Sequence, residues 1–157
     1  MTFRLLIAPA LLCLALAACG PDKPRVGKRL DTPQEAVSRI GDITVRANLV
    51  PTASLNEGVA RSYGIERGDR RLMLLVSVRQ GPDGLETALP ATITATVANL
   101  HGQRETLAMR EIRSGDYIDY VGATEVSPPD TLTFDLKIVR EGGAASTMRF
   151  SRDFSPQ

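Results

Sequence analysis

The sequence predicts an all-β fold, an immunoglobulin-like antiparallel β-sandwich of about seven strands with one or two short helices near the N-terminus. From Leu72 onward, apolar residues recur at every second position, which is the period of a strand with one buried face. Turn-forming stretches, such as GPDG at Gly81–Gly84 and SPPD at 127–130, separate these runs at spacings typical of antiparallel domains. A closed barrel is the alternative packing for the same strands.

The alternation places the predicted core on one face of each strand. Ile93, Ala95 and Val97 share one face of the stretch TITATVA, and threonines occupy the other. The inward-facing residues of the last two strands are predicted to be Leu132, Phe134, Leu136, Ile138, Met148, Phe150 and Phe154. The predicted strands are Asp42–Leu49, Leu72–Val78, Thr92–Ala98, Glu105–Ile112, Tyr117–Ala123, Thr131–Val139 and Thr147–Phe154.

Two short helices are expected ahead of the strand-rich region. The stretch TPQE (Thr32–Glu35) has capping-box spacing with proline at the first helical position, and it predicts a helix through Arg39. A second helix is predicted over Asn56–Tyr63, with Ser54 or Asn56 as its N-cap. Gly64 then has the position of a left-handed C-terminal stop.

The first eighteen residues have the features of an export signal. Arg4 precedes the uncharged run Leu5–Ala18, which is shorter than the roughly 20 apolar residues that a spanning helix needs. The following stretch LAACG resembles the lipobox of bacterial lipoproteins, in which the chain is cut before the cysteine and that cysteine is acylated. Cys19 is therefore the predicted lipid-attachment site, and a chance cysteine after an ordinary signal is the alternative. Cys13 would leave with the signal, so no internal disulfide is expected.

The predicted organisation has three parts: a lipoprotein signal peptide (1–18), a tether with a short helix (19–39) and a single β-sandwich domain (40–157). The tether sequence GPDKPRVGKRL combines proline, glycine and basic residues without an apolar period. In lipoproteins an aspartate after the acylated cysteine commonly favours retention at the inner membrane. Gly20 stands at this position, so the expected location is the periplasm, anchored at the outer membrane's inner leaflet rather than at the inner membrane.

The charge balance argues against a nucleic-acid partner. Removal of residues 1–18 takes away Arg4, one of 19 basic residues, and none of the 18 acidic residues, so the remaining chain is formally neutral. Nucleic-acid binding depends on a basic surface that neutralises phosphates, and export leads to the same exclusion. The remaining length is sufficient for one domain with its own core.

The stretches EGVARSYGIERGDRRLMLLVSVRQG, ATVANLHGQRETLAMREIRSGDYIDYVGA and DTLTFDLKIV resemble a family of bacterial exported proteins, domain of unknown function 4426. The resemblance covers roughly Ile40–Phe154. It implies a small periplasmic β-sandwich and no reaction, because the family offers no established catalytic or binding residues to carry over. Its members typically carry plain signal peptides, and the lipobox and longer tether depart from that pattern.

The residues that an enzyme would need are sparse. His101 is the only histidine and lies in a predicted hairpin turn, NLHGQ, where an exposed polar role is expected. One histidine and no free thiol give no plausible zinc ligand set. Asp116 and Asp119 are close enough in sequence to bind calcium or to share acid–base work, but turn capping and solvation on a strand also explain them. No catalytic residue, cofactor or metal is predicted.

The densest charge cluster is ERGDRR, which contains Arg67, Arg70 and Arg71, with Arg61 about one helical turn earlier. Arginines grouped on a loop before a rigid strand can bind carboxylates or phosphate of a partner. Alternation with acidic residues also fits a loop whose charges compensate one another. We therefore expect a membrane-anchored, non-catalytic binding or assembly module that meets an envelope protein through this loop or through an exposed sheet edge. The alternatives are a carboxylate-dependent enzyme acting on cell-wall or sugar substrates and a purely structural envelope protein. The oligomeric state stays open.

Overall fold

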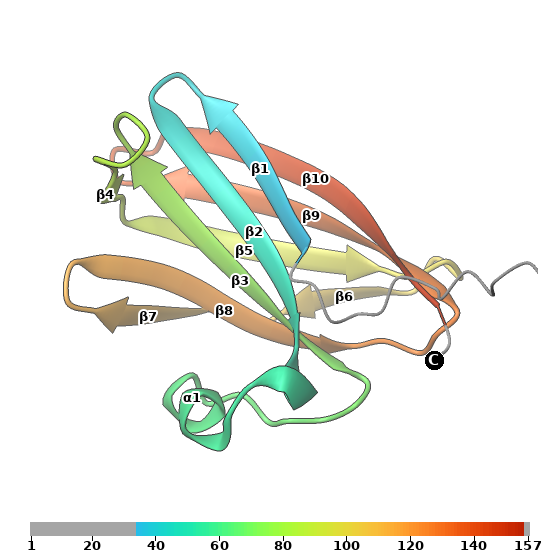
Figure 1. The fold of residues 1–157 in the computed structure, drawn as a ribbon. Helices are drawn as coiled ribbons and strands as arrows, with labels where there is room; N and C mark the ends of the chain where they lie inside the picture. Colours follow the sequence, from blue (N-terminus) through green and yellow to red (C-terminus); the bar gives the residue numbers. More distant parts are fainter. Residues whose placement is uncertain (1–33, 156–157) are drawn as a thin grey trace, which may run out of the picture.

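Two antiparallel sheets form the protein, as its computed structural model shows for residues 34–155. The first sheet has the order β1-β2-β3-β8-β7, with β4 paired to β3, and the second has the order β10-β9-β5-β6 (Figure 1). The strands of the first sheet are β1 (Gln34–Ile40), β2 (Ile43–Pro51), β3 (Arg71–Gln80), β4 (Thr87–Ala88), β7 (Arg110–Ser114) and β8 (Tyr117–Glu125). Those of the second are β5 (Ala91–Ala98), β6 (Arg104–Leu107), β9 (Asp130–Arg140) and β10 (Ala145–Phe154).

The all-β prediction is confirmed, but the expected number of about seven strands is wrong, because residues 34–155 contain ten. The strand pairings among these residues stay within each sheet, so the alternative of a closed barrel is not what they form. Besides the strands there are a short 3-10 helix, η1 (Thr52–Ser54), and one α-helix, α1 (Glu57–Ser62). No helix in the described part of the chain is long and apolar enough to cross a membrane.

The core lies between the two sheets, where the predicted alternation is confirmed. Ile93, Ala95 and Val97 are buried, as are all seven inward-facing residues predicted for the last two strands. Phe134 and Phe150, on neighbouring strands of the second sheet, stack with ring centroids 5.1 Å apart. The buried Tyr120 joins the sheets: its hydroxyl accepts from the Ala91 N–H (2.7 Å), and burial raises the pKa of this phenol.

The predicted helix over Thr32–Arg39 is wrong for the residues that the structure describes, because they form β1 instead. β1 pairs with β2 from Gln34↔Leu49 to Ile40↔Ile43 through a tight turn in which Gly41 has φ +64°. A capping signal is local and weak, whereas a hairpin satisfies backbone groups along its whole length and places Ala36 against the core. Residues 34–39, expected in the tether, therefore belong to the β-domain.

The predicted strand Glu105–Ile112 is divided between the two sheets. β6 pairs with β5 in the second sheet, and β7 pairs with β8 in the first. The connection passes close to Gly122, where a Cβ atom would lie 2.6 Å from the Met109 sulfur. This glycine therefore lets the chain change sheets next to β8. The division, together with β1 and the two-residue β4, accounts for the three additional strands.

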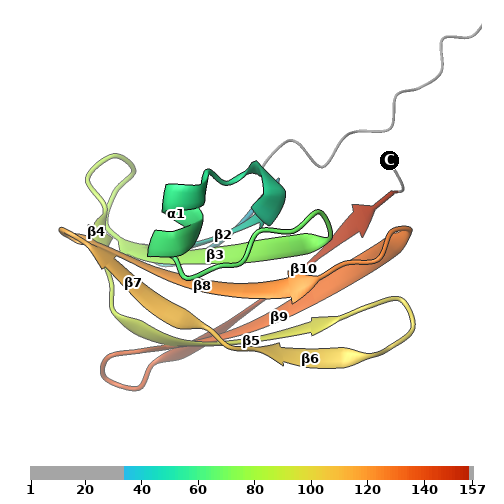
Figure 2. The same ribbon diagram turned by 90° about the horizontal axis from the view of Figure 1, so that it is seen from below.

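The predicted helix over Asn56–Tyr63 is confirmed as α1, with Asn56 as its N-cap. The Asn56 side chain accepts from the Val59 N–H (2.8 Å), and Gly64 ends the helix with φ +54°. α1 lies on the face of the first sheet that points away from the second sheet (Figure 2). Met73 and Val121 are buried on this outer face, apart from the main core. Successive strand residues point to opposite faces of a sheet, and Leu72, Leu74 and Tyr120 next to them point into the core.

Candidate functional site

The arginine-rich loop connects α1 to β3, and one buried hydroxyl fastens its centre. Thr52 in η1 is completely buried; its Oγ1 donates to the Gly68 carbonyl (3.2 Å) and accepts from the Gly68 N–H (2.9 Å). Farther along, the Val126 N–H donates to the Arg70 carbonyl (2.8 Å). The middle and the end of the loop are thus held by groups that do not depend on any exposed charge.

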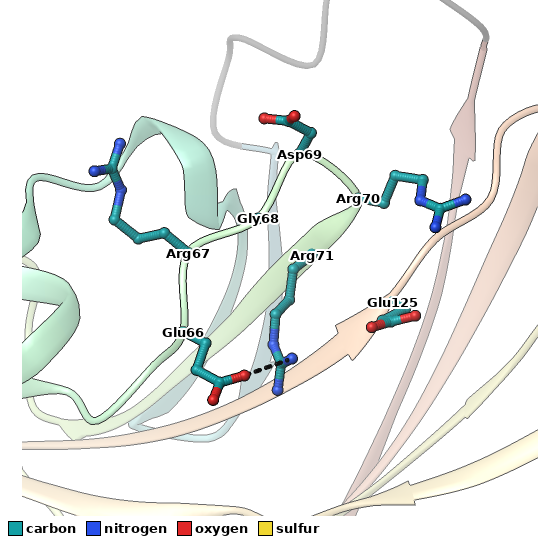
Figure 3. Close-up of a pocket in the computed structure, with 7 residues that line it drawn as sticks. All are labelled: Glu66, Arg67, Gly68, Asp69, Arg70, Arg71 and Glu125. Carbon is teal, nitrogen blue, oxygen red and sulfur yellow. Dashed lines mark hydrogen bonds and ion pairs between the residues drawn. The ribbon is translucent and has the colours of Figure 1, made fainter.

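Two of the loop's arginines hold the loop itself. Arg67 donates from Nη2 to the carbonyl oxygen of Ala53 (2.8 Å). Arg71, the first residue of β3, donates from Nη1 to Glu66 Oε2 (3.1 Å), as the dashed line in Figure 3 marks. Both guanidinium groups are therefore already engaged within the chain.

Arg70 differs from these two arginines. Its side chain is exposed, and among residues 34–155 it takes part in no ion pair and no side-chain hydrogen bond. Figure 3 shows Arg67 and Arg70 pointing in opposite directions. Both line an open cavity of about 320 Å³, together with the rest of residues 66–71 and Glu125. Within the described chain, Arg70 is thus the loop arginine whose guanidinium is available to another molecule.

A second open cavity of about 330 Å³ adjoins the first, since Arg71 and Glu125 line both. Thr124 lines it too and donates from Oγ1 to Glu105 Oε2 (3.0 Å). Three arginines and four carboxylates (Glu66, Asp69, Glu105 and Glu125) line the two cavities together. This surface therefore has one more acidic than basic residue and is not a basic patch. We call the end formed by η1, α1, residues 64–70 and Glu125 the arginine end.

Arg61 does not join the other three arginines around the cavity. It lies on α1 and pairs with Glu57 one turn earlier (3.3 Å), with both side chains 74% exposed. Such an exposed helical pair is a local contact that contributes a few tenths of a kcal/mol, roughly 0.3–0.5. The predicted loop surface thus gathers Arg67, Arg70 and Arg71 but not Arg61.

The sequence matches the family described as "Domain of unknown function (DUF4426)" over residues 37–156. The chain belongs to the DUF4426 family. The solved structure of a DUF4426 family protein from Pseudomonas aeruginosa PAO1 is similar, with 25% sequence identity, 78% of this chain and 96% of that chain covered, and a TM-score of 0.68. A search of the curated proteins finds no match.

FetP from uropathogenic E. coli strain F11 is similar to this DUF4426 chain in fold. The form isolated after recombinant expression in the periplasm of E. coli BL21(DE3) is 11% identical, with 79% and 95% of the two chains covered and a TM-score of 0.57. A copper-bound variant of FetP is 10% identical, with 80% and 92% covered and a TM-score of 0.56. At these identities the likeness extends to the fold alone.

The other candidate residues of this DUF4426 chain do not converge. Asp119 on β8 accepts from Arg79 Nη2 (2.7 Å), while Asp116 is exposed in the turn before β8, and neither lines the cavities described above. His101 is exposed in the turn after β5, as predicted. In the described part of the chain, no group of three or more His, Cys, Asp or Glu side chains is placed to hold a metal ion. Cys19 lies outside the described residues.

The sequence did not reveal the residues that organise these loops. Thr52 carries no signal of its own, because any surface threonine has the same appearance in a sequence. The pairs Arg39–Asp83 and Arg46–Glu86, at the other end of the DUF4426 domain, join residues 44 and 40 positions apart. A clue existed in the acidic residues of GPDGLE (81–86), but only the strand order shows which arginines they face.

Proposed function

We propose that this DUF4426 protein is a lipoprotein of the periplasm, anchored through Cys19, and acts as a non-catalytic binding module for another envelope protein. The observation that carries the proposal is the contrast within one fixed loop. Arg67 and Arg71 hold the loop in place, and Arg70 presents an unengaged guanidinium beside an open cavity. The backbone of Arg70 is held by the Val126 N–H, and its unengaged guanidinium is suited to a carboxylate or phosphate of a partner, since it binds such groups in a bidentate manner.

The export signal and the lipobox support the envelope location, with the outer membrane's inner leaflet as the proposed site of anchoring. The fold likeness to FetP, which was expressed in the periplasm, is compatible with it. Copper is not part of the proposal, because a likeness at 10% identity does not transfer a ligand.

The engagement of Asp119 supports a non-catalytic role. Asp119 forms an ion pair with Arg79, whose side chain is 11% exposed, and Arg79 also donates to the Ile118 carbonyl (2.7 Å). A general base needs a free lone pair within reach of a substrate. Asp116 lies in the turn before β8, and neither acid lines the two cavities described above.

The strand order supports an immunoglobulin-like sandwich as the finer description of the fold. Without β1, β4 and β6, the order is β2-β3-β8-β7 in one sheet and β10-β9-β5 in the other. When these seven strands are lettered A to G along the chain, the sheets become ABED and GFC, the order of constant-type immunoglobulin domains. An experimental structure with another strand order would overturn this description.

In vivo photocrosslinking tests the binding role. A photoreactive residue replaces the exposed Asp69, next to Arg70, and the full chain is irradiated in living cells. We expect one discrete adduct with an envelope protein, lost in Arg70→Glu and retained in Arg61→Glu. The second variant is matched, because it makes the same charge change at the same end on a residue outside the cavity. An adduct that survives Arg70→Glu, or none above background, contradicts the proposal.

The anchor has its own test. Cys19→Ala should abolish acylation and cleavage at this site, because both depend on the cysteine of a lipobox. Mass spectrometry of the mature N-terminus measures both. A normally processed Cys19→Ala protein would show that the lipobox is a coincidence, without affecting the loop proposal.

A further inference from the structure

The end of the molecule opposite the arginine end gathers four turns, at residues 41–42, 81–86, 115–116 and 141–144. Three of them meet because β2, β3 and β8 are antiparallel neighbours, with Ile43 paired to Gln80 and the Arg79 guanidinium 5.6 Å from the Tyr117 ring centroid. The fourth joins them from the second sheet, where Ala91 pairs with Arg140 and also donates to the Tyr120 hydroxyl. We call this the leucine end.

Leu85 is 78% exposed at the tip of the turn between β3 and β4. Single exposed apolar residues are ordinary on protein surfaces and need no explanation by themselves. Leu85 is unusual in the way its loop is held. The loop projects on the same side of the first sheet as α1 (Figure 2), and ionic contacts fasten it on both sides of the leucine.

Before Leu85, Asp83 accepts two hydrogen bonds from Arg39 Nη2, at 2.9 and 3.0 Å. After it, Glu86 accepts from both terminal nitrogens of Arg46, each at 3.0 Å, and these two side chains are only 16% and 25% exposed. Inside the loop, the Leu85 N–H donates to the Pro82 carbonyl (3.0 Å). β1 and β2 thus fasten this six-residue turn through Arg39 and Arg46, while its apolar residue stays exposed to water.

Other apolar side chains accompany Leu85. Of the five exposed large hydrophobic residues in the described chain, three lie at the leucine end: Leu85, Tyr117 (65%) and Ile40 (40%). The Arg79 guanidinium, itself paired with Asp119, lies over the Tyr117 ring and restricts it. Tyrosine is a common interface anchor, and an apolar side chain on a restrained segment loses little conformational entropy when a partner buries it.

Among the described residues, most charges at this end that lack an ion-pair partner are acidic, and Arg140 at the end of β9 is the exception. Arg39, Arg46 and Arg79 are each engaged by a carboxylate within the chain. Asp42, Asp116 and Glu141, which lie in the other three turns, are exposed, and none of them is in an ion pair among residues 34–155. A partner that covers Leu85 would therefore meet carboxylates at its rim, and it is best matched by lysine or arginine side chains there.

We propose that the leucine end is a second interaction surface, which inserts Leu85 into an apolar pocket of a folded protein whose rim is basic. This surface is independent of the proposed role of Arg70, since the two lie at opposite ends of the domain. The first described strand begins at Gln34, which pairs with Leu49 near the arginine end, so the leucine end lies at the opposite end of β1 from Gln34.

The first test is photocrosslinking of the full chain in living cells from two matched positions. One strain carries a photoreactive residue in place of Leu85 and the other in place of Leu100, a 67% exposed turn leucine that lies far from the leucine end. The expected result is a discrete adduct with one other protein from position 85 only. No adduct above the Leu100 background would overturn the proposal, and so would an adduct made of two copies of this chain.

The second test measures the affinity of the purified full chain for the purified protein that the adduct identifies. Leu85→Ala should weaken binding about 10- to 30-fold, as for an interface anchor, and Leu85→Asp should abolish it. Higher salt should also weaken it, because the rim contacts are ionic. Arg70→Glu should leave this affinity unchanged, which separates a failure here from a failure of the loop proposal. Unchanged affinity in Leu85→Asp would overturn the assignment; since Leu85 is exposed, this variant should fold normally.

Discussion

The two ends of the domain both present a restrained loop, but they differ in the contacts that restrain it and in the side chain that it exposes. At the arginine end, the buried Thr52 fastens the centre of the loop, Arg67 and Arg71 add contacts within it, and Arg70 is presented. At the leucine end, Arg39 and Arg46 fasten the loop, and Leu85 is presented. The comparison teaches that arginine density does not identify a binding loop, because an arginine whose carboxylate lies in the same chain is part of the scaffold.

The largest effect is expected where the fastening group is buried. Thr52→Val keeps the shape of the side chain but removes both hydrogen bonds to Gly68 and leaves its N–H without a partner. We expect the free energy of unfolding to fall by about 2–3 kcal/mol, measured by urea denaturation. Thr52→Ser is the control, since it keeps the hydroxyl and should lose less. Equal losses in the two variants would contradict a dominant role of the hydrogen bonds, because packing of the methyl group, which only Thr52→Ser removes, would then contribute as much.

A smaller effect is expected from the fastening pair at the leucine end. Glu86→Gln keeps the side-chain shape and removes the charge that Arg46 faces; the hydrogen bond to Glu86 also raises the pKa of the Arg46 guanidinium. Because the pair is partly exposed, we expect a loss of about 1–2 kcal/mol, again from urea denaturation. Glu57→Gln breaks the exposed helical pair with Arg61 and should cost less than about 0.5 kcal/mol. If both changes cost the same, the Arg46–Glu86 pair does not restrain the loop.

The sequence predicts the parts of the fold that follow from period two. Strands with one buried face, such as Thr131–Val139, are recognisable because each core residue is two positions from the next. It did not predict β1, because this strand has few apolar residues and forms by pairing with β2. It also joined β6 and β7 into one strand, because a change of sheet at Ala108 and Met109 leaves no turn signal.

The candidate site was predictable only as a segment. The sequence locates the arginine cluster, but it does not distinguish Arg70 from Arg67 and Arg71, because the distinction depends on Ala53 and Glu66 as their partners. The leucine end was recognised as a turn and no more. Its restraint depends on arginines about 40 residues earlier in the chain, and such long-range pairs are set by strand order and not by local sequence.

The smallest effect uses pH to test the ionic fastening of the leucine end through Asp83. The hydrogen bond from Arg39, with the charge of that residue, lowers the pKa of Asp83. The folded-state pKa is then below the unfolded one, so this stabilisation is complete above the unfolded pKa of about 3.9 and is lost as the pH falls through the folded pKa.

The difference in urea midpoint between the wild type and Asp83→Asn should be constant from neutral pH to about pH 5 and shrink below about pH 4. Arg39→Ala should bring the Asp83 pKa, measured by carboxyl NMR titration, back toward its ordinary value. Amide protection factors should fall with pH at residues 81–86 more than at Gly68, whose partner Thr52 does not titrate. Equal loss of protection at both loops would mean that ionic contacts hold the two ends alike.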